Sequence, residues 1–471
     1  MRLVKILVSI AVSLIILLIP TESFGITGLT IVEKRVIALF VLAAFFWILE
    51  PIPIYATSVL IIVLELIILS DKGMILFRNG IENPEFGTLL PYKSIFGTFS
   101  SPIILLFTGG FFLAMAATKY QLDKNLARII IKPFGNKPKF VMLGLMIITA
   151  VLSMFMSNTA TTAMMLAILT PVLALFDLSD KGRIALALSI PIAANIGGIG
   201  TPIGTPPNAI ALKYLVGENT ISFGQWMSFG IPFVIVLLSI AWVLLTIMYP
   251  ASTKEVKLNI QTKFIKNQKA YIVYATFAGT ILLWLTDFIH GMNSYIVAML
   301  PVGIFSITGI INKEDLKKIS WDVLWLVSGG IALGLAMDKS GLAKNLVNSI
   351  PFENYSPHMI IGGAALLTVV MANFMSNTAT ANLLMPILAA LGTSVSSLAG
   401  LGGLPTLIIV AAIAASMGMA LPISTPPNAL AHGTGAVNSK NMARIGIIIG
   451  AIGLLLAFLT VYILNMVNFI D

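Results

Sequence analysis

The stretch FMSNTAT at residues 155–161 is repeated without change at residues 374–380. A second stretch, TPPNA at residues 205–209, recurs at residues 425–429 with almost the same spacing. Two exact sequence matches at almost the same separation are hard to obtain by chance. They predict an internal duplication in which each copy covers about half of the chain.

The composition places this duplicated chain in a membrane. Of its 471 residues, 58% are hydrophobic and 10% are charged, whereas soluble proteins carry about a quarter of charged residues. The absence of cysteine excludes disulfides, thiolate metal sites and thiol catalysis. The net charge of +9 is interpreted as basic cytoplasmic loops and not as a nucleic-acid surface. We therefore predict an all-α polytopic membrane protein, which excludes a cytosolic enzyme.

Apolar runs separated by charged or Pro/Gly-rich breaks predict about 11 transmembrane helices plus two re-entrant hairpins. The expected helices span residues 3–20, 34–49, 52–70, 102–118, 139–157, 160–176, 183–201, 208–216, 229–249, 270–287, 294–311, 322–337, 358–375, 379–392, 405–421, 428–437 and 444–468. The first run follows Arg2 and Lys5, as in a signal peptide, but no cleavage site follows it, so we expect a membrane helix.

The basic residues favour hairpins at 139–176 and 358–392 over ordinary spans. If each hairpin enters and leaves by one side, and 183–216 and 405–437 are each one interrupted span, most lysines and arginines lie on the inner side. This topology predicts a multi-pass protein of the cytoplasmic membrane with the N-terminus inside and the C-terminus outside. Two further segments, 120–132 and 340–350, are expected to be interfacial helices or ordinary amphipathic connectors.

The two repeats are expected to be inverted relative to each other, because an odd number of crossings separates their equivalent points. Lys124-Asn125-Leu126 pairs with Lys344-Asn345-Leu346, and the glycines 109–110 pair with 329–330. Inverted repeats with interrupted helices are typical of secondary transporters, which bind substrate near the midplane of the membrane. One hairpin enters from each side, so the two Ser-Asn-Thr tips can meet there.

Each Ser-Asn-Thr motif leaves the helix at membrane depth, where such backbone must be buried in protein or line a cavity. Ser, Asn and Thr are preferred N-caps, so the helix that follows directs free N–H groups and a positive dipole end towards the tip. Thr205 and Thr425 are expected to cap helices that begin with Pro206 and Pro426. Four helix N-termini would then face one centre, and such an arrangement binds anions without buried Arg or Lys.

The alternative is that these motifs are ordinary caps and kinks, as a single copy of either would be. Two copies of both motifs in an inverted repeat favour a binding site. Asn and Thr side chains can hold carboxylate oxygens. Carbonyl and hydroxyl oxygens on the other side of each tip can coordinate a small hard cation.

The paired Ser-Asn-Thr and Thr-Pro-Pro motifs resemble the signature of the divalent-anion/sodium symporter family (DASS), the INDY-type carriers of di- and tricarboxylates. The resemblance covers nearly the whole chain, including FWILEPIP at residues 46–53, and points to a bacterial member. It implies a homodimer that moves its substrate by an elevator motion. The implied domains are a scaffold, residues 1–138 and 250–355, and a transport domain with two repeats, residues 139–249 and 356–471.

The resemblance also implies which residues hold the substrate and the coupling ion; no other cofactor is expected. The residues expected to contact the substrate, or to lie beside it, are Ser157, Asn158, Thr159, Thr205, Pro206, Ser376, Asn377, Thr378, Thr425 and Pro426. The first sodium site would use Ser153, Ser157, Asn158 and the carbonyl of Gly204. The second would use Asn377, Ser424 and the position of Ala372.

The chain departs from the sodium-coupled pattern in the second repeat. Ser153 precedes the first Ser-Asn-Thr motif by four residues, but its repeat mate is Ala372, which offers no hydroxyl. Lys213 and His432 follow the two Pro-Pro motifs, and a cation fixed near the site could supply charge that sodium supplies elsewhere. Their ordinary roles would be an interfacial lysine and a core histidine. These departures favour sodium-independent exchange.

Glu65 lies inside an apolar run, where a carboxylate suggests function, but no motif accompanies it, so a scaffold or dimer-interface role is favoured. Glu50 and Asp322 lie near membrane boundaries and need no special role.

The sequence therefore predicts a secondary transporter of C4 and C5 dicarboxylates such as succinate, malate, fumarate and 2-oxoglutarate, with anion exchange favoured. A sodium-coupled di- or tricarboxylate or sulfate symporter is the alternative. An intramembrane enzyme is disfavoured, because the chain has neither His-Glu-x-x-His nor Gly-x-Ser-x-Gly. A channel would differ by a conductance far above the turnover of a carrier.

Overall fold

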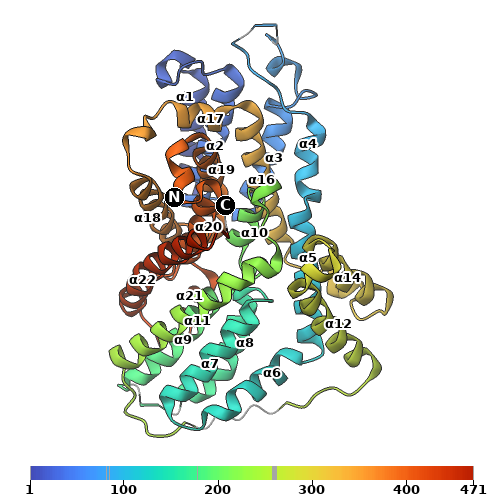
Figure 1. Cartoon of the computed structure of the whole chain (residues 1–471), viewed down its shortest axis with the longest axis vertical. Coiled ribbons are helices and arrows are strands. Elements are labelled where there is room, and N and C mark those ends of the chain that lie inside the picture. Colours follow the sequence, from blue (N-terminus) through green and yellow to red (C-terminus); the bar gives the residue numbers. More distant parts are fainter. Residues whose placement is uncertain are drawn as a thin grey trace.

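The computed structural model describes residues 2–80, 82–83, 85–174, 176–177, 179–256 and 262–469. Over these residues the chain is helical and has no β-strand beyond an isolated bridge between Ser70 and Leu90 (Figure 1). The all-α prediction is therefore confirmed. The outer limits of the predicted domains, residues 1 and 471, lie outside the described residues.

Apolar helices dominate this fold. Within the described residues, five helical segments are long and apolar enough to cross a membrane: Tyr92–Lys119, Phe223–Met248, Trp321–Ser340, Pro357–Phe374 and Ser439–Met466. Several shorter apolar helices accompany them. Because lipid offers no hydrogen-bond partners, these runs satisfy their backbone groups within each helix. The chain is a polytopic membrane protein.

A first group of helices occupies the upper and right-hand side of Figure 1. In this group α1 packs on α2, α2 on α3, α3 on α16, α5 on α14, and α12 on both α5 and α14. Its members are α1 (Arg2–Leu18), α2 (Ile31–Leu49), α3 (Ile54–Ile68), α4 (Tyr92–Gly97), α5 (Pro102–Lys119), α12 (Gln268–Leu285), α14 (Ser294–Ile307) and α16 (Trp321–Ser340).

A second group contains both hairpins and both interrupted helices. In this group α7 and α8 pack on α9, α18 and α19 pack on α20, and α21 packs on α8 and α9 of the other repeat. Its members are α7 (Pro138–Ser153), α8 (Asn158–Leu173), α9 (Lys181–Gly198), α10 (Pro206–Leu212), α11 (Phe223–Met248), α18 (Pro357–Phe374), α19 (Asn377–Ser394), α20 (Gly403–Ser416), α21 (Pro426–Gly433) and α22 (Ser439–Met466).

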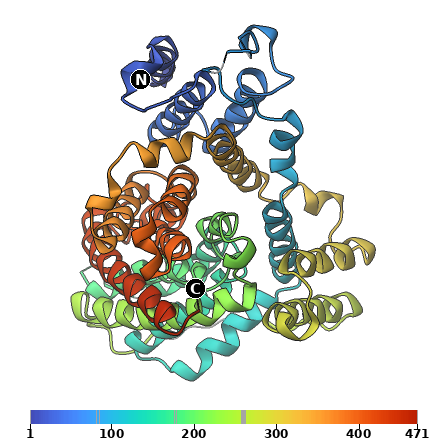
Figure 2. The same cartoon turned by 45° about the horizontal axis from the view of Figure 1, so that its top comes forward.

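The two repeats enter the molecule from opposite ends. In Figure 1 the hairpin α7–α8 and the amphipathic helix α6 (Leu122–Ile131) lie at the lower end, whereas α18–α19 and α17 (Leu342–Asn348) lie in the upper part. Figure 2 shows the red and orange helices of the second repeat beside the green and cyan helices of the first, with the blue and yellow helices of the first group around them. This arrangement matches the predicted inverted repeat.

The structure differs from the predicted helices mainly before α5. The prediction began at residue 102, but α4 starts at Tyr92 and is followed by a 3-10 turn, Thr98–Ser100, and then, after the non-helical Ser101, by α5. Hydropathy did not predict this helix, because the stretch contains several polar residues. Ser101 caps the next segment by accepting a hydrogen bond from the backbone N–H of Ile103 at 3.4 Å.

The two glycine pairs explain how the groups of helices fit together. The first glycine of each pair faces the first group: a Cβ on Gly109 would meet the carbonyl of Ala298 in α14, and one on Gly329 would lie 2.7 Å from the Cα of Ser58 in α3. Because backbones come this close only where no side chain intervenes, both positions need glycine. Gly109 and Gly329 occupy equivalent positions in the two repeats, so a glycine allows close helix packing in both halves of the first group.

We expect Gly329→Leu to destabilise the protein, because overpacking a close helix contact costs about 1–3 kcal/mol. The purified variant should have a lower thermal unfolding temperature in detergent than the wild type. Gly303→Leu is the matched control, since no atom lies within 4 Å of a Cβ built there. Equal unfolding temperatures for the two variants would show that the α3–α16 contact tolerates a side chain.

Candidate functional site

A cavity of about 350 Å³ lies where both hairpin tips meet the breaks of the two interrupted helices. Its lining includes all the residues predicted to contact or flank the substrate: Ser157, Asn158, Thr159, Thr205, Pro206, Ser376, Asn377, Thr378, Thr425 and Pro426. The four motifs of the two repeats are therefore gathered in one place. Their contact with a substrate stays a prediction.

The hairpin tips present helix N-termini to this cavity. The hydroxyl of Ser157 accepts a hydrogen bond from the backbone N–H of Ala160 at 3.3 Å, and that of Ser376 accepts one from Ala379 at 3.2 Å. Both serines are thus N-caps, and the asparagine after each one is the first residue of α8 or α19. Helices of this length carry partial positive charge at such an end.

The breaks of the interrupted helices are held by the asparagine of each TPPN stretch. The side-chain amide of Asn208 donates to the carbonyl of Thr201 at 2.8 Å, and that of Asn428 donates to the carbonyl of Met419 at 2.7 Å. These carbonyls have left the helix and need donors inside a membrane. Of the two predicted threonine caps, Thr425 accepts the N–H of Asn428 at 3.3 Å, whereas Thr205 makes no side-chain cap bond, so that part of the prediction is wrong. The sequence pattern also missed this role of the Asn.

The first predicted sodium set forms a compact group of oxygens. The set is Ser153, Ser157, Asn158 and Gly204. The hydroxyl oxygen of Ser153 lies 2.6 Å from Asn158 Oδ1 and 2.8 Å from the carbonyl oxygen of Ala194. A Cβ built on Gly198 would lie 2.9 Å from Asn158 Oδ1 and 3.0 Å from the carbonyl oxygen of Gly204, so both oxygens border that glycine. Oxygen ligands of this kind suit a small hard cation.

The second predicted set, Ala372, Asn377 and Ser424, is arranged differently. Ala372 is fully buried, and its methyl group packs against Gly418. The hydroxyl of Ser424 donates to the carbonyl of Asn373 at 2.8 Å and accepts from the N–H of Leu421 at 3.1 Å. Asn377 and Ser424 both line the cavity. The second repeat therefore lacks the Ser–Asn contact seen in the first.

The opposite wall of the cavity comes from the first group of helices: Ile54, Tyr55, Phe107, Phe111, Asp322, Val323 and Leu326. Asp322, for which no special role was expected, is thus a cavity residue, and within the described lining no Lys, Arg or His accompanies it. Asn195, at the end of α9, is a further lining residue that the motifs did not indicate. Neither could be found without knowing which helix ends meet.

Lys213 and His432 do not line this cavity. Lys213 follows α10, and its ammonium group donates to the carbonyl of Ile331 in α16 at 2.9 Å. His432 is exposed, with Nε2 3.3 Å from the hydroxyl of Ser439. Glu65 is fully buried in α3, and neither of its oxygens has a hydrogen-bond partner among the described residues. The interpretation of Lys213 and His432 as a pair of charges at the site does not fit this placement.

Comparisons with known proteins agree with the fold. The family described as "Sodium:sulfate symporter transmembrane region" matches residues 1–468. The sodium-dependent dicarboxylate transporter SdcS of Staphylococcus aureus strain NCTC 8325 is 33% identical over 466 residues, which cover 91% of this chain and 85% of that protein. SdcS of strain COL matches equally well. The crystal structure of the Alcanivorax borkumensis YdaH transporter matches with a TM-score of 0.58 at 12% identity, over 92% of this chain and 99% of that chain.

Proposed function

Since the chain belongs to the sodium:sulfate symporter family, and is therefore a membrane transporter and not an enzyme, we propose that it carries C4 and C5 dicarboxylates such as succinate, malate, fumarate and 2-oxoglutarate. The observation that carries this proposal is the cavity where two Ser-Asn-Thr tips meet two Thr-Pro-Pro breaks. Amides and hydroxyls from opposite repeats can hold the two ends of a short dianion.

The charge balance of the cavity supports sodium-coupled symport. The N-termini of α8 and α19 each act as roughly half a positive charge, so together they offset roughly one of the two charges of a dicarboxylate. The described lining adds no basic side chain, and Asp322 adds an acidic one, so the cavity needs a further cation. A sodium ion at Ser153, Asn158 and Gly204 would offset the second charge, and the SdcS relatives are named sodium-dependent. A buried ion without a partner would be strongly unfavourable.

Sodium-independent exchange is the second candidate, and Ala372 is the observation that favours it. The second repeat offers no hydroxyl at that position, and the Ser424 hydroxyl, which already donates once and accepts once, keeps one lone pair for an ion. An exchanger needs no coupling ion, because one dianion leaves as another enters. The family also leaves sulfate open as a substrate.

Uptake driven by a sodium gradient tests the proposed function. Purified protein in empty vesicles should accumulate labelled succinate when sodium is outside, and unlabelled malate, fumarate or 2-oxoglutarate should compete. Uptake that appears only in vesicles loaded with a dicarboxylate, with or without sodium, would support the exchanger. Uptake of labelled sulfate by a protein that takes up none of these dicarboxylates would contradict the dicarboxylate assignment.

We expect Ser153→Ala to raise the sodium concentration for half-maximal succinate uptake about tenfold, the effect of losing about 1.4 kcal/mol. The reason is that Ser153 supplies the hydroxyl beside Asn158 Oδ1. Ser13→Ala is the control, because Ser13 is also a buried helix hydroxyl, donating to the carbonyl of Ala38 at 2.8 Å, but lies far from the cavity in α1. An unchanged sodium dependence in Ser153→Ala would remove this residue from the ion site.

We also propose that the second group of helices moves as a transport domain against the first, as a scaffold, in an elevator motion. The domains would be residues 139–249 with 356–471, and residues 1–138 with 250–355. The second glycine of each glycine pair supports this division, because it faces the other group: Gly330 lies against Asn382 of α19, and a Cβ on Gly110 would lie 3.3 Å from Ile203. By the family resemblance the scaffold would form a homodimer.

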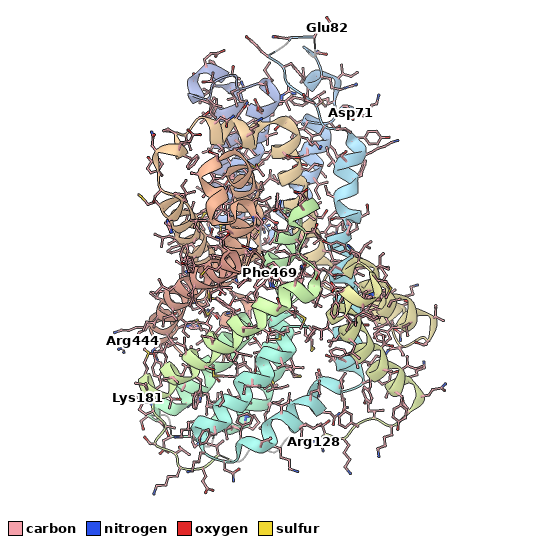
Figure 3. All side chains as sticks on the ribbon, in the orientation of Figure 1. Asp71, Glu82, Arg128, Lys181, Arg444 and Phe469 are labelled. Carbon is pink, nitrogen blue, oxygen red and sulfur yellow. The ribbon has the colours of Figure 1, made fainter. Side chains whose placement is uncertain are left out.

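The orientation of the protein in the membrane is proposed from its basic residues. Figure 3 shows the basic side chains of Arg128 and Lys181 towards the lower end of the molecule, far from the acidic Asp71 at the upper end. Basic loops mark the inner side of a membrane protein. This distribution supports a cytoplasmic lower end in the view of Figure 3. The cytoplasmic N-terminus and external C-terminus, in the cytoplasmic membrane, stay a prediction from the basic residues of the sequence.

A further inference from the structure

Asn195 connects the two halves of the site. It belongs to α9 of the first repeat, is 1% exposed and lines the cavity. Its side-chain nitrogen lies 3.2 Å from the hydroxyl oxygen of Thr425 and 3.3 Å from Oδ1 of Asn428, both in the second repeat. The amide has two N–H groups, so it can donate to both oxygens at once.

The hydrogen-bond network fixes the orientation of this amide. The nitrogen of Asn428 donates to the carbonyls of Met419 and Leu421 at 2.7 and 3.0 Å. Its oxygen must therefore be the atom that faces Asn195, and an oxygen needs a donor. The group of Asn195 that faces Thr425 is then the NH2 and not the oxygen.

This contact determines what the hydroxyl of Thr425 can do. The oxygen accepts from Asn195 and also from the backbone N–H of Asn428 at 3.3 Å, so both lone pairs are used. Its proton has no acceptor among the described residues, and Thr425 borders the cavity. A hydroxyl that accepts twice donates more strongly, because hydrogen bonds in a chain polarise one another.

In the first repeat no corresponding amide donates to the equivalent threonine, Thr205, among the described residues. The position equivalent to Asn195 in the second repeat is Ala415, which could not reach Thr205. Thr205 makes no side-chain cap bond, whereas Thr425 does. The Oδ1 of Asn195 has no hydrogen-bond partner among the described residues. Its two bonds to the second repeat are therefore the side-chain hydrogen bonds that Asn195 makes among the described residues.

We propose that Asn195 is a positioning residue of the substrate site, which fixes the hydroxyl of Thr425 as a donor to one carboxylate of the substrate. This inference rests on the proposed function. The two carboxylates would then be held unequally: one by a preset donor at Thr425, and the other by a Thr205 hydroxyl that is free to rotate. Asn195 itself acts through Thr425 and need not touch the anion.

The test is a double-mutant cycle on the uptake of labelled succinate by vesicles that contain the purified protein. Asn195→Ala and Thr425→Val should each raise the concentration for half-maximal uptake about tenfold, since a hydrogen bond to a charged group contributes on this scale. The maximal rate should stay within about twofold of the wild type. The double variant should be no worse than Thr425→Val alone, because both changes remove one donor. Asn195→Ser, which keeps a donor, should recover part of the affinity.

The control pair is Asn195→Ala with Thr205→Val, which share no hydrogen bond and should therefore show multiplied effects. If the effects of Asn195→Ala and Thr425→Val multiply in an active protein, the inference about Asn195 is overturned but the proposed function is not. A loss of maximal rate without a change in the half-maximal concentration would have the same consequence. A wild-type protein that takes up none of succinate, malate, fumarate, 2-oxoglutarate or sulfate would overturn the proposed function, and this inference with it.

Discussion

Asn158→Ala and Asn377→Ala are each expected to lower the initial rate of succinate uptake at least about a hundredfold, which corresponds to about 2.7 kcal/mol. Each asparagine begins the helix that follows a hairpin tip and lines the shared cavity. Asn158 also faces Ser153 at 2.6 Å, so its loss would affect the ion as well. The Oδ1 of Asn377 has no partner among the described residues, as expected of a group that awaits a ligand.

The measurement is uptake of labelled succinate by purified variants in vesicles, with the amount of folded protein checked by size-exclusion chromatography. Asn438→Ala is the matched control. Asn438 caps α22 by accepting from the N–H of Asn441 at 2.8 Å and is exposed, so its loss costs about 1 kcal/mol of helix stability and should leave uptake unchanged. If either Asn158→Ala or Asn377→Ala transports normally, the two tips do not form one site.

Lys213→Met is expected to destabilise the protein by about 1–3 kcal/mol, because it leaves the carbonyl of Ile331 without its donor and removes the positive charge near the buried Glu65. Lys213 sits between the two groups of helices, bonded to the carbonyl of Ile331, and Glu65 and Asp338 are close enough to interact with its charge. Glu65 is fully buried. Gly334 makes room for the lysine, since a Cβ there would lie 2.7 Å from the ammonium nitrogen.

The thermal unfolding temperature of the detergent-purified protein measures this effect. The double variant Lys213→Met/Glu65→Gln should recover part of the loss, because it also removes the carboxyl group that the lysine charge acts on. Lys440→Met is the control, since Lys440 is an exposed lysine at the start of α22. A double variant that is no more stable than Lys213→Met would show that Glu65 does not depend on the lysine charge.

The sequence could predict the helices whose signals, an apolar run or a cap motif, lie within a few neighbouring residues. Long apolar runs can only be helices in lipid, and a repeated cap motif such as FMSNTAT must begin a helix, so the starts of α8 and α19 were expected within a few residues. The helix α4 was missed because its polar residues resemble a loop. The motif side of the cavity lining was predicted, whereas the wall formed by the first group of helices was not.

The parts that the sequence could not predict depend on contacts between distant helices. Asn195 becomes a site residue only because α9 packs against α21 of the other repeat. Asp322 reaches the cavity because α16 starts there, and the sequence showed only a residue near a membrane boundary. Lys213 and His432 occupy similar places in the two repeats, yet one docks on α16 and the other is exposed. Sequence symmetry did not extend to their surroundings.

Counterflow of labelled succinate tests the central claim most directly, that one cavity shared by the two inverted repeats carries a dicarboxylate. Vesicles containing the purified protein are loaded with unlabelled succinate and diluted into labelled succinate, with sodium on both sides. Either coupling mode predicts transient accumulation of label inside, and empty protein-free vesicles should show none. An absence of counterflow with succinate, malate, fumarate and 2-oxoglutarate, in a protein that remains folded, would contradict the account.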